Sequence, residues 1–418
     1  MKSRTLLILL FCSSALAAGS GGVNAPEQRG KPYLVLVSID GFRWDYQDRY
    51  ATPALDRIAA KGIRAARMVP VFPTLTFPNH YSIATGLYPA HHGLIGNRFL
   101  SRDRKRYYDV ADRQAVQDGS WYRGEPVWVA AEKAGMVTAA CFFVGTEADI
   151  DGVPMTYWKA YDEAVPGDER VMQVLDWLAM PADRRPHFIT LYFEDVDKAS
   201  HHAGPDTPAS IAAIGKADGY LAELMAGIDA LPIASDVYVV VVSDHGQAAR
   251  KDDEQPFIID TVVDMNGMFV VDHGAVAFVY LPEPDRSRAL SVRDAINRSW
   301  THGKAMLRED APASWHVDEA AGFADIIVQA DPQYLVFSSA ERVTTASRGD
   351  HGWPREFEAM HGIFLAAGPR LPMGRKIGAI EAVDIYPLLM KILELPATTP
   401  IDGDPDLLTR YLGQKAAD

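Results

Sequence analysis

The hydrophobic positions of this chain fall into continuous runs rather than alternating ones. Residues 33–39 read YLVLVSI, and residues 187–193 and 236–242 are almost as apolar. Continuous runs of this length are typical of central strands that are covered on both faces. Between them, residues 168–179 and 207–229 are expected to be helices. Strands that alternate with helices predict an α/β fold with a doubly wound, mostly parallel sheet.

The pattern of predicted helices and strands changes between residues 251 and 345. One helical stretch is expected there around 287–307, among short apolar segments. These segments, which we expect to be strands, are 275–281, 323–330 and 334–338. We interpret residues 251–345 as an inserted, smaller α+β portion, a peripheral unit or lid. The predicted catalytic domain is therefore discontinuous and consists of residues 32–250 and 346–418.

The first seventeen residues have the order of an export signal. Lys2 and Arg4 precede the apolar run 6–11, and residues 15–17 form a small-x-small cleavage site. We expect residues 1–17 to be a signal peptide, 18–31 to be a disordered lead-in, and the mature protein to be exported, either periplasmic or secreted. The apolar run is too short to cross a bilayer, and no later stretch reads as transmembrane.

The composition is that of a globular chain with an acidic surface. Of the 418 residues 48% are apolar, and the formal net charge is −14 at pH 7. This balance disfavours a nucleic-acid groove or an anionic membrane surface as the partner, because both attract positive charge. A small anionic substrate would need metal ions to offset the acidic field.

Acidic and imidazole side chains follow several of the predicted strands or turns. They are Asp40, Asp197, His201, Asp244, His245 and His351. Because the carboxyl ends of parallel strands share one edge of a sheet, we expect these side chains to converge. Two metal ions in open catalytic sites need three or four protein ligands each, which this set can supply.

One hydroxyl stands out among the polar residues. The proline-bracketed turn 72–80 leads into a predicted helix over 81–85 and presents Thr76 at its start. Unpaired backbone N–H groups at such a point favour a bound anion. A threonine hydroxyl is a poor nucleophile at neutral pH, so it needs an activator such as a metal ion. Asn97, in a later loop, is an uncharged donor that could reach a phosphoryl oxygen.

Together these motifs resemble the nucleotide pyrophosphatase/phosphodiesterase family of the alkaline phosphatase superfamily. The segments that carry the resemblance are 35–42, 72–80, 85–89, Asp197-x3-His201-x2-Gly204-Pro205, 243–246 and His351-Gly352. They cover nearly the whole mature chain in order, and the Thr-Phe-Pro-Asn-His stretch at 76–80 is highly specific. The resemblance implies an alkaline-phosphatase-like fold.

The resemblance also implies two zinc ions and a role for each site residue. One ion would be held by Asp197, His201 and His351, and the other by Asp40, Asp244, His245 and Thr76. Asn97 would stabilise the oxyanion, with help from the Phe77 N–H group, and the rings of Phe77 and Tyr192 would sandwich a nucleobase.

The activity implied by the resemblance is hydrolysis of nucleotide phosphodiester and phosphoanhydride bonds. The partner is then a small-molecule nucleotide, and a covalent Thr76 intermediate would release nucleoside 5′-monophosphates. Two segments depart from the family pattern. Residues 142–145 read FFVG where the family often has aromatic-Trp-Pro-Gly, and residues 353–355 read WPR where it often has Tyr-Asp-Asn. Both departures avoid the ligands but bear on the identity of the substrate.

Other activities stay open at this point. The two rings could enclose choline, as in a choline-lipid phosphodiesterase. A phosphomonoesterase usually needs an added arginine or third metal, and no arginine lies close to Thr76 in the sequence. A non-catalytic, metal-stabilised binding protein is a further alternative, and these ligand types also admit manganese or iron.

Overall fold

The computed structural model describes residues 22–251, 255–318, 321–343 and 347–413. The predicted signal peptide lies outside these ranges. Residues 22–31 are described, and they do not form the disordered lead-in expected of 18–31. Asn24 is buried, and its amide group donates to the carbonyl oxygens of Ala182 and Arg185 at 3.0 and 2.8 Å. This segment is therefore tied to the body of the molecule.

The body is built on one eight-stranded sheet. Its strands are β1 (Tyr33–Ile39), β2 (Gly62–Ala65), β6 (Thr138–Cys141), β7 (Tyr157–Trp158), β8 (Phe188–Phe193), β9 (Val237–Val242), β18 (Phe364–Ala367) and β19 (Arg375–Ile377). Their order is β19-β2-β18-β9-β1-β8-β6-β7. The central strand β1 runs parallel to β8 and β9, whereas β18 runs antiparallel to β9 and β2. The predicted α/β fold with a mostly parallel sheet is confirmed.

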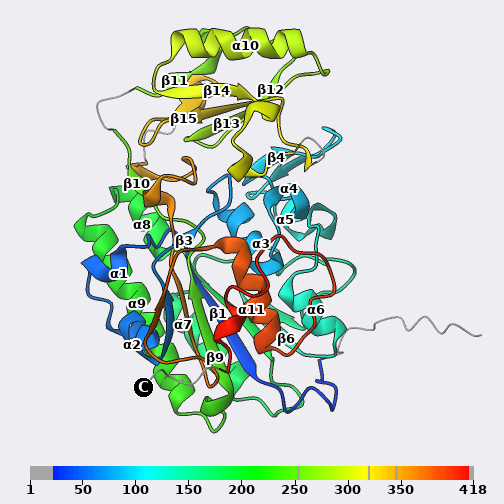
Figure 1. The fold of residues 1–418 in the computed structure, drawn as a ribbon, viewed down its shortest axis with the longest axis vertical. Helices are drawn as coiled ribbons and strands as arrows, with labels where there is room; N and C mark the ends of the chain where they lie inside the picture. The colour runs from blue at the N-terminus through cyan, green and yellow to red at the C-terminus, as the bar shows by residue number, and fades with distance from the viewer. Residues whose placement is uncertain (1–21, 252–254, 319–320, 344–346, 414–418) are drawn as a thin grey trace, which may run out of the picture.

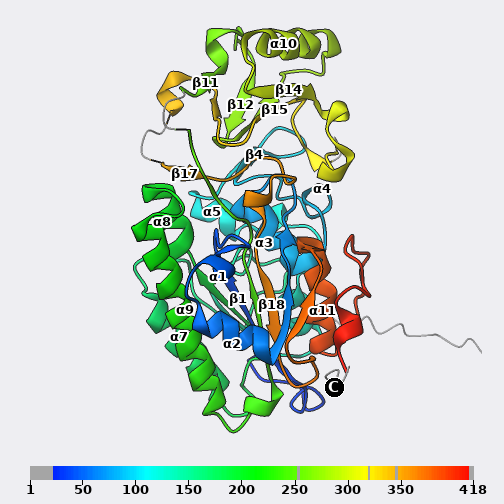
Figure 2. The same ribbon diagram turned by 60° about the vertical axis from the view of Figure 1, so that its left-hand side comes forward.

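Helices cover both faces of this sheet. One face carries α2 (Pro53–Lys61), α7 (Gly167–Leu178) and α9 (Pro208–Asp229), and the other carries α3 (Thr76–Thr85), α6 (Val127–Lys133) and α11 (Ile385–Ile392). Figure 2 shows α9 and α2 on one side of β1 and α11 on the other. Along β1, Val35 and Val37 pack toward α2, α7 and α9, while Leu34 and Leu36 pack toward α3, α6 and α11. The continuous apolar run of this strand thus serves two cores.

Shorter elements complete the body. They are α1 (Tyr46–Arg49), β3 (Met68–Val69), α4 (Pro89–His92), β4 (Arg98–Leu100), β5 (Tyr107–Asp109), α5 (Arg113–Gln117), α8 (Asp195–Ala203) and β20 (Ile380–Glu381). The charged segment 99–120, an excursion from the main sheet, buries Phe99, Tyr108 and Val116. Within it, Arg104 ion-pairs with Asp325 at 2.8 Å.

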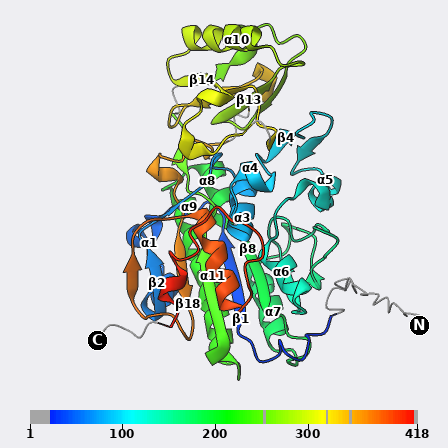
Figure 3. The same ribbon diagram turned by 45° about the vertical axis from the view of Figure 1, so that its right-hand side comes forward.

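A second unit follows β10 (Ala248–Ala249). Its four-stranded antiparallel sheet has the order β12 (Phe269–Asp272), β13 (Val276–Tyr280), β15 (Ile326–Ala330), β14 (Gly303–Leu307), and α10 (Arg286–Ser299) packs on it. The helix predicted over 287–307 ends at Ser299, and its last part is the strand β14. The small strands β11 (Phe257–Ile258) and β16 (Val336–Phe337) pair in parallel beside this sheet. Figures 1 and 3 show this unit at one end of the body, with α10 outermost.

The chain enters and leaves the second unit side by side. Outgoing β10 pairs antiparallel with returning β17 (Gly349–Asp350). His351 follows β17 directly. None of the described helices has the length and apolar character needed to cross a membrane.

Candidate metal-binding and catalytic site

Thr76 is the first residue of α3, so the helix begins earlier than the predicted 81–85. The buried side chain of Asn79 fixes the turn before it. The Asn79 oxygen accepts from the Val71 N–H group at 2.7 Å, and its amide nitrogen donates to the carbonyl oxygens of Pro73 and Leu75 at 3.0 and 2.9 Å. This turn holds Thr76 Oγ1 at 3.3 Å from His245 Nε2.

The first metal-ligand group lies at the carboxyl ends of β1 and β9. Asp40, Asp244 and His245 are buried, and one potential ligand atom of each lies within 4.8 Å of the others. His245 Nε2 is 3.6 Å from Asp40 Oδ1 and 3.1 Å from Asp244 Oδ2. These residues directly follow their strands, as the sequence predicts.

The second group combines α8 with the chain that returns from the second unit. Asp197 and His201 lie one turn apart on α8, with Asp197 Oδ1 at 3.4 Å from His201 Nε2, and His351 completes the set. The two groups adjoin, because the rings of His245 and His351 stack with their centroids 3.7 Å apart. The structure therefore brings together all six side chains that the sequence singles out.

Each of the three imidazoles is oriented by a backbone carbonyl. The Nδ1 atoms of His201, His245 and His351 lie 2.9, 3.0 and 2.9 Å from the carbonyl oxygens of Gly349, Gly246 and Thr74. A carbonyl oxygen only accepts, so Nδ1 must donate in each case. In the neutral ring, Nε2 then presents a lone pair toward the carboxylates, which is the arrangement of a metal ligand.

The electrostatics of the site also fit bound cations. Burial raises the pKa of Asp40 well above its usual range, and the carboxylates of Asp244 and Asp197 raise it further. Burial would also raise the pKa of Asp244, but His245 and His80 hold that pKa well below its usual range. Among the described residues, Asp40 Oδ1 and Asp244 Oδ2 are buried without a hydrogen-bond partner. A cation would satisfy these atoms and relieve the repulsion between the carboxylates.

Asn97 lies beside Thr76, but its partner differs from expectation. Asn97 Oδ1 accepts from the Phe77 N–H group at 2.9 Å. That N–H group was expected to help hold the negative charge of the phosphoryl oxygen, and here it is already engaged. The Asn97 amide nitrogen is thereby left as the donor on this side of Thr76.

Tyr192 lies close to both the first metal-ligand group and Phe77. Its hydroxyl donates to Asp40 Oδ2 at 2.6 Å, which ties the ring to the first metal-ligand group. Tyr192 does line a cavity of about 200 Å³ next to Thr76, together with Phe77 and Tyr161. Tyr161, which is 36% exposed, was missed from the sequence because its loop shows no periodicity or motif.

The same cavity contains the segment that departs from the family pattern. Phe142, Phe143 and Val144 form part of its lining. Phe142 has φ 66°, a left-handed backbone conformation that is costly for a residue with a Cβ atom. Its ring packs under the Arg170 guanidinium at 4.8 Å, and Arg170 is paired with Glu194. The unusual segment is thus fixed as one wall of the cavity.

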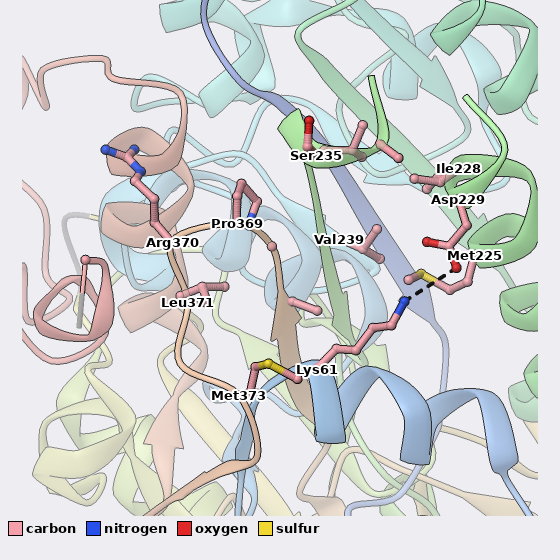
Figure 4. Close-up of a pocket in the computed structure, with 15 residues that line it drawn as sticks. Lys61, Met225, Ile228, Asp229, Ser235, Val239, Pro369, Arg370, Leu371 and Met373 are labelled. Atoms are coloured by element: carbon pink, nitrogen blue, oxygen red, sulfur yellow. Dashed lines mark hydrogen bonds and ion pairs between the residues drawn. The ribbon is translucent and has the colours of Figure 1, made fainter. Parts of the chain in front are cut away.

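A second cavity of about 540 Å³ opens on the other side of Asn97. Its lining includes His201 and His351 of the body together with Arg342 and Asp272 of the second unit. A third cavity of about 760 Å³ lies at the opposite end of β9, lined by Lys61, Val239 and Met373 among others (Figure 4). None of the predicted site residues lines the third cavity, whose rim carries the Lys61–Asp229 ion pair.

The chain is similar in sequence to a known family of proteins. Residues 34–354 match the family model described as type I phosphodiesterase / nucleotide pyrophosphatase. Ectonucleotide pyrophosphatase/phosphodiesterase family member 1 of Homo sapiens is 31% identical over 393 residues, which is 91% of this chain and 42% of that protein. Venom phosphodiesterase of Naja atra is 30% identical over 386 residues, 90% of this chain and 46% of that protein. The chain thus spans less than half the length of these relatives.

Solved structures resemble the whole described body. Human ectonucleotide pyrophosphatase / phosphodiesterase 5 superposes with a TM-score of 0.85 at 27% identity, covering 91% of this chain and 100% of that one. The murine protein of the same name, as an inactive variant in complex with AMP, gives a TM-score of 0.84 at 27% identity over the same shares of the two chains.

Proposed function

Because the chain belongs to the type I phosphodiesterase / nucleotide pyrophosphatase family, we propose that it hydrolyses phosphodiester and phosphoanhydride bonds of nucleotides and releases nucleoside 5′-monophosphates. The observation that carries this proposal is the position of Thr76. Its hydroxyl lies against two adjoining ligand groups on one side and opens into an aromatic-lined cavity on the other.

Two zinc ions are proposed as the resident metals. Asp197, His201 and His351 would hold one ion, and Asp40, Asp244 and His245 with Thr76 Oγ1 the other. When bound, such ions would lower the pKa of the Thr76 hydroxyl and offset the negative charge of the phosphate. The three oriented imidazoles and the two orphan carboxylate oxygens support this assignment.

The proposed reaction has two displacements at phosphorus. Thr76 Oγ1 loses its proton to solvent and attacks in line, so that the Thr76–phosphorus bond forms as the bond to the leaving oxygen breaks. The Asn97 amide nitrogen donates to a non-bridging oxygen as its negative charge grows, a contribution of about 3 kcal/mol in comparable sites. Water then attacks the nucleotidyl-Thr76 phosphorus and releases the monophosphate.

The two cavities near Thr76 would bind different parts of the substrate. The aromatic cavity suits a nucleobase, with Phe77 and Tyr161 as the rings that face it and Tyr192 as its inner wall. The leaving group would occupy the polar cavity next to His201 and His351. Binding of AMP by the murine neighbour supports a nucleotide ligand. An exported location is supported by the sequence of residues 1–17 and by the venom relatives.

The test is a comparison of Thr76→Ala with Thr76→Ser on the nitrophenyl ester of thymidine monophosphate. We expect Thr76→Ala to lower turnover by about a thousandfold or more and Thr76→Ser to retain part of it, with metal content unchanged in both. Thr301→Ala, which removes an exposed hydroxyl, is the matched control. Turnover near that of the wild type in Thr76→Ala would remove Thr76 as the nucleophile.

A substrate panel separates the alternatives. Preference for nitrophenyl phosphate would indicate a phosphomonoesterase, and preference for nitrophenyl phosphorylcholine a choline-lipid phosphodiesterase. A metal-loaded protein that turns over none of these esters would be a binding protein.

A further inference from the structure

The base end of the aromatic cavity carries one charged pair in an otherwise apolar lining. Arg113, the first residue of α5, and Glu147 both line this cavity with the rings of Phe77 and Tyr161. Resting on the proposed function, we propose that Arg113 selects nucleotides whose base carries a carbonyl group at the position of guanine O6 or uracil O4, namely guanine, uracil and thymine, over adenine and cytosine, which carry an amino group there.

Glu147 positions neighbouring residues of the cavity and is not a second group that recognises the base. Its side chain is only 5% exposed, and its Oε1 atom accepts from the Tyr161 N–H group at 2.9 Å. Its Oε2 atom accepts from Gln117 Nε2 at 3.1 Å and from Arg113 Nη2. Arg113 and Gln117 lie one turn apart on α5, so both reach the same carboxylate. The carboxylate therefore fixes Arg113 and the loop of Tyr161 in one arrangement.

The pair offers the base hydrogen-bond donors. A guanidinium has five N–H groups and no acceptor, and the bond to Glu147 uses only part of them. The Glu147 oxygens are already engaged by three donors. Nearby backbone acceptors are also engaged, because the carbonyl oxygens of Phe142 and Phe143 accept from Thr190 Oγ1 and Thr146 Oγ1.

This arrangement of donors discriminates between otherwise similar bases. Guanine presents O6 and N7 as acceptors, a pattern that arginine matches with two bonds, and uracil presents O4. Adenine and cytosine carry an amino group at the corresponding position, which cannot accept a hydrogen bond from Arg113. A site that hydrogen-bonds one substrate group rejects the analogue that lacks it.

The experiment compares matched pairs of nucleoside triphosphates on the full protein. We expect kcat/KM for GTP to exceed that for ATP by about tenfold, because a two-bond arginine contact discriminates by roughly fivefold to a hundredfold. UTP should exceed CTP by a smaller factor, because uracil offers Arg113 one acceptor. Arg113→Gln should bring both ratios close to one. Arg113→Lys, which keeps the charge opposite Glu147 but loses the fork, should also lower the GTP:ATP ratio.

Controls separate recognition from folding. Arg106→Gln removes an arginine of the same excursion that pairs with Asp118 instead, and it should keep the wild-type ratios. Bis(nitrophenyl) phosphate has no base, so Arg113→Gln should change kcat/KM for this ester less than it changes kcat/KM for GTP. A wild-type enzyme that hydrolyses all four triphosphates with equal kcat/KM would overturn the selectivity, as would Arg113 variants with unchanged ratios. Failure of the proposed function is a different result, in which the wild type hydrolyses no diester at all.

Discussion

The hydroxyl of Tyr192 offers a sharp test of the site, through the variant Tyr192→Phe. It removes one oxygen atom and keeps the ring that lines the aromatic cavity. In the wild type this hydroxyl donates to Asp40 Oδ2 at 2.6 Å, and Asp40 is 1% exposed. Burial and the neighbouring carboxylates raise the pKa of Asp40, so its ionised form depends on such partners.

The magnitude follows from the kind of bond that is lost. A hydrogen bond to a charged group contributes about 1.5–3 kcal/mol. Removal of a partner that orients a metal-ligating side chain typically weakens metal binding about tenfold to a hundredfold. We therefore expect Tyr192→Phe to bind the ion of the Asp40 group roughly tenfold to a hundredfold more weakly than the wild type does. The ion of the Asp197 group should be held as before.

Metal content measured after dialysis against a series of zinc buffers is the assay, and it should show two separated steps in the variant. Tyr238→Phe, which removes a hydroxyl bonded to Arg370 instead, is the control. Retention of both ions at wild-type affinity in Tyr192→Phe would refute the reasoning.

Three further predictions concern the metals, the base and pH. Chelation of both ions should lower the melting temperature, because a ligand at a thousandfold above its Kd stabilises by about 4 kcal/mol, and added zinc should restore it; an unchanged melting temperature would contradict bound structural ions. Tyr161→Ala should raise KM for nucleotides about tenfold, the cost of one lost base–ring stack, while hydrolysis of bis(nitrophenyl) phosphate stays constant; equal effects on both would exclude stacking. Burial lowers the pKa of His92 to about 3, so below pH 6.5 the unfolded chain takes up this proton before the folded one. The stability that neutral His92 contributes is thus present above pH 6.5 and decreases by about 1.4 kcal/mol at pH 5.5. His92→Gln should therefore show a smaller fall in melting temperature than wild type between pH 7.5 and 5.5, and parallel falls would contradict the assignment.

The sequence predicts the fold and the candidate metal ligands for a shared reason. Apolar runs such as 33–39 identify central strands, and side chains that follow such strands must meet at one edge. Asp40 and Asp244 are predictable on this basis. His351 is less so, because it follows the connecting strand β17 rather than a strand of the main sheet.

The remaining parts of the site depend on contacts that leave no pattern in the sequence. Tyr161 lies in an irregular loop, and its position is set by Glu147 through a backbone hydrogen bond. Arg113 becomes a cavity residue because α5, which lies within the charged segment 99–120, contributes to the cavity lining. His92 ends α4, where it is buried and bonded to Ser82 at 2.9 Å, a contact that no pattern in the sequence indicates.

The pairing of β10 with β17 determines the order in which the two candidate ligand groups are completed as the chain is synthesised. A chain that emerges N-terminus first has Asp40, Asp244 and His245 available before the second unit is made. His351 arrives only after that unit, on the strand that closes against β10. The two proposed ions would therefore be acquired in sequence, and a protein interrupted within residues 251–345 would hold one of them and lack the other. Metal stoichiometry would then report on completion of the fold.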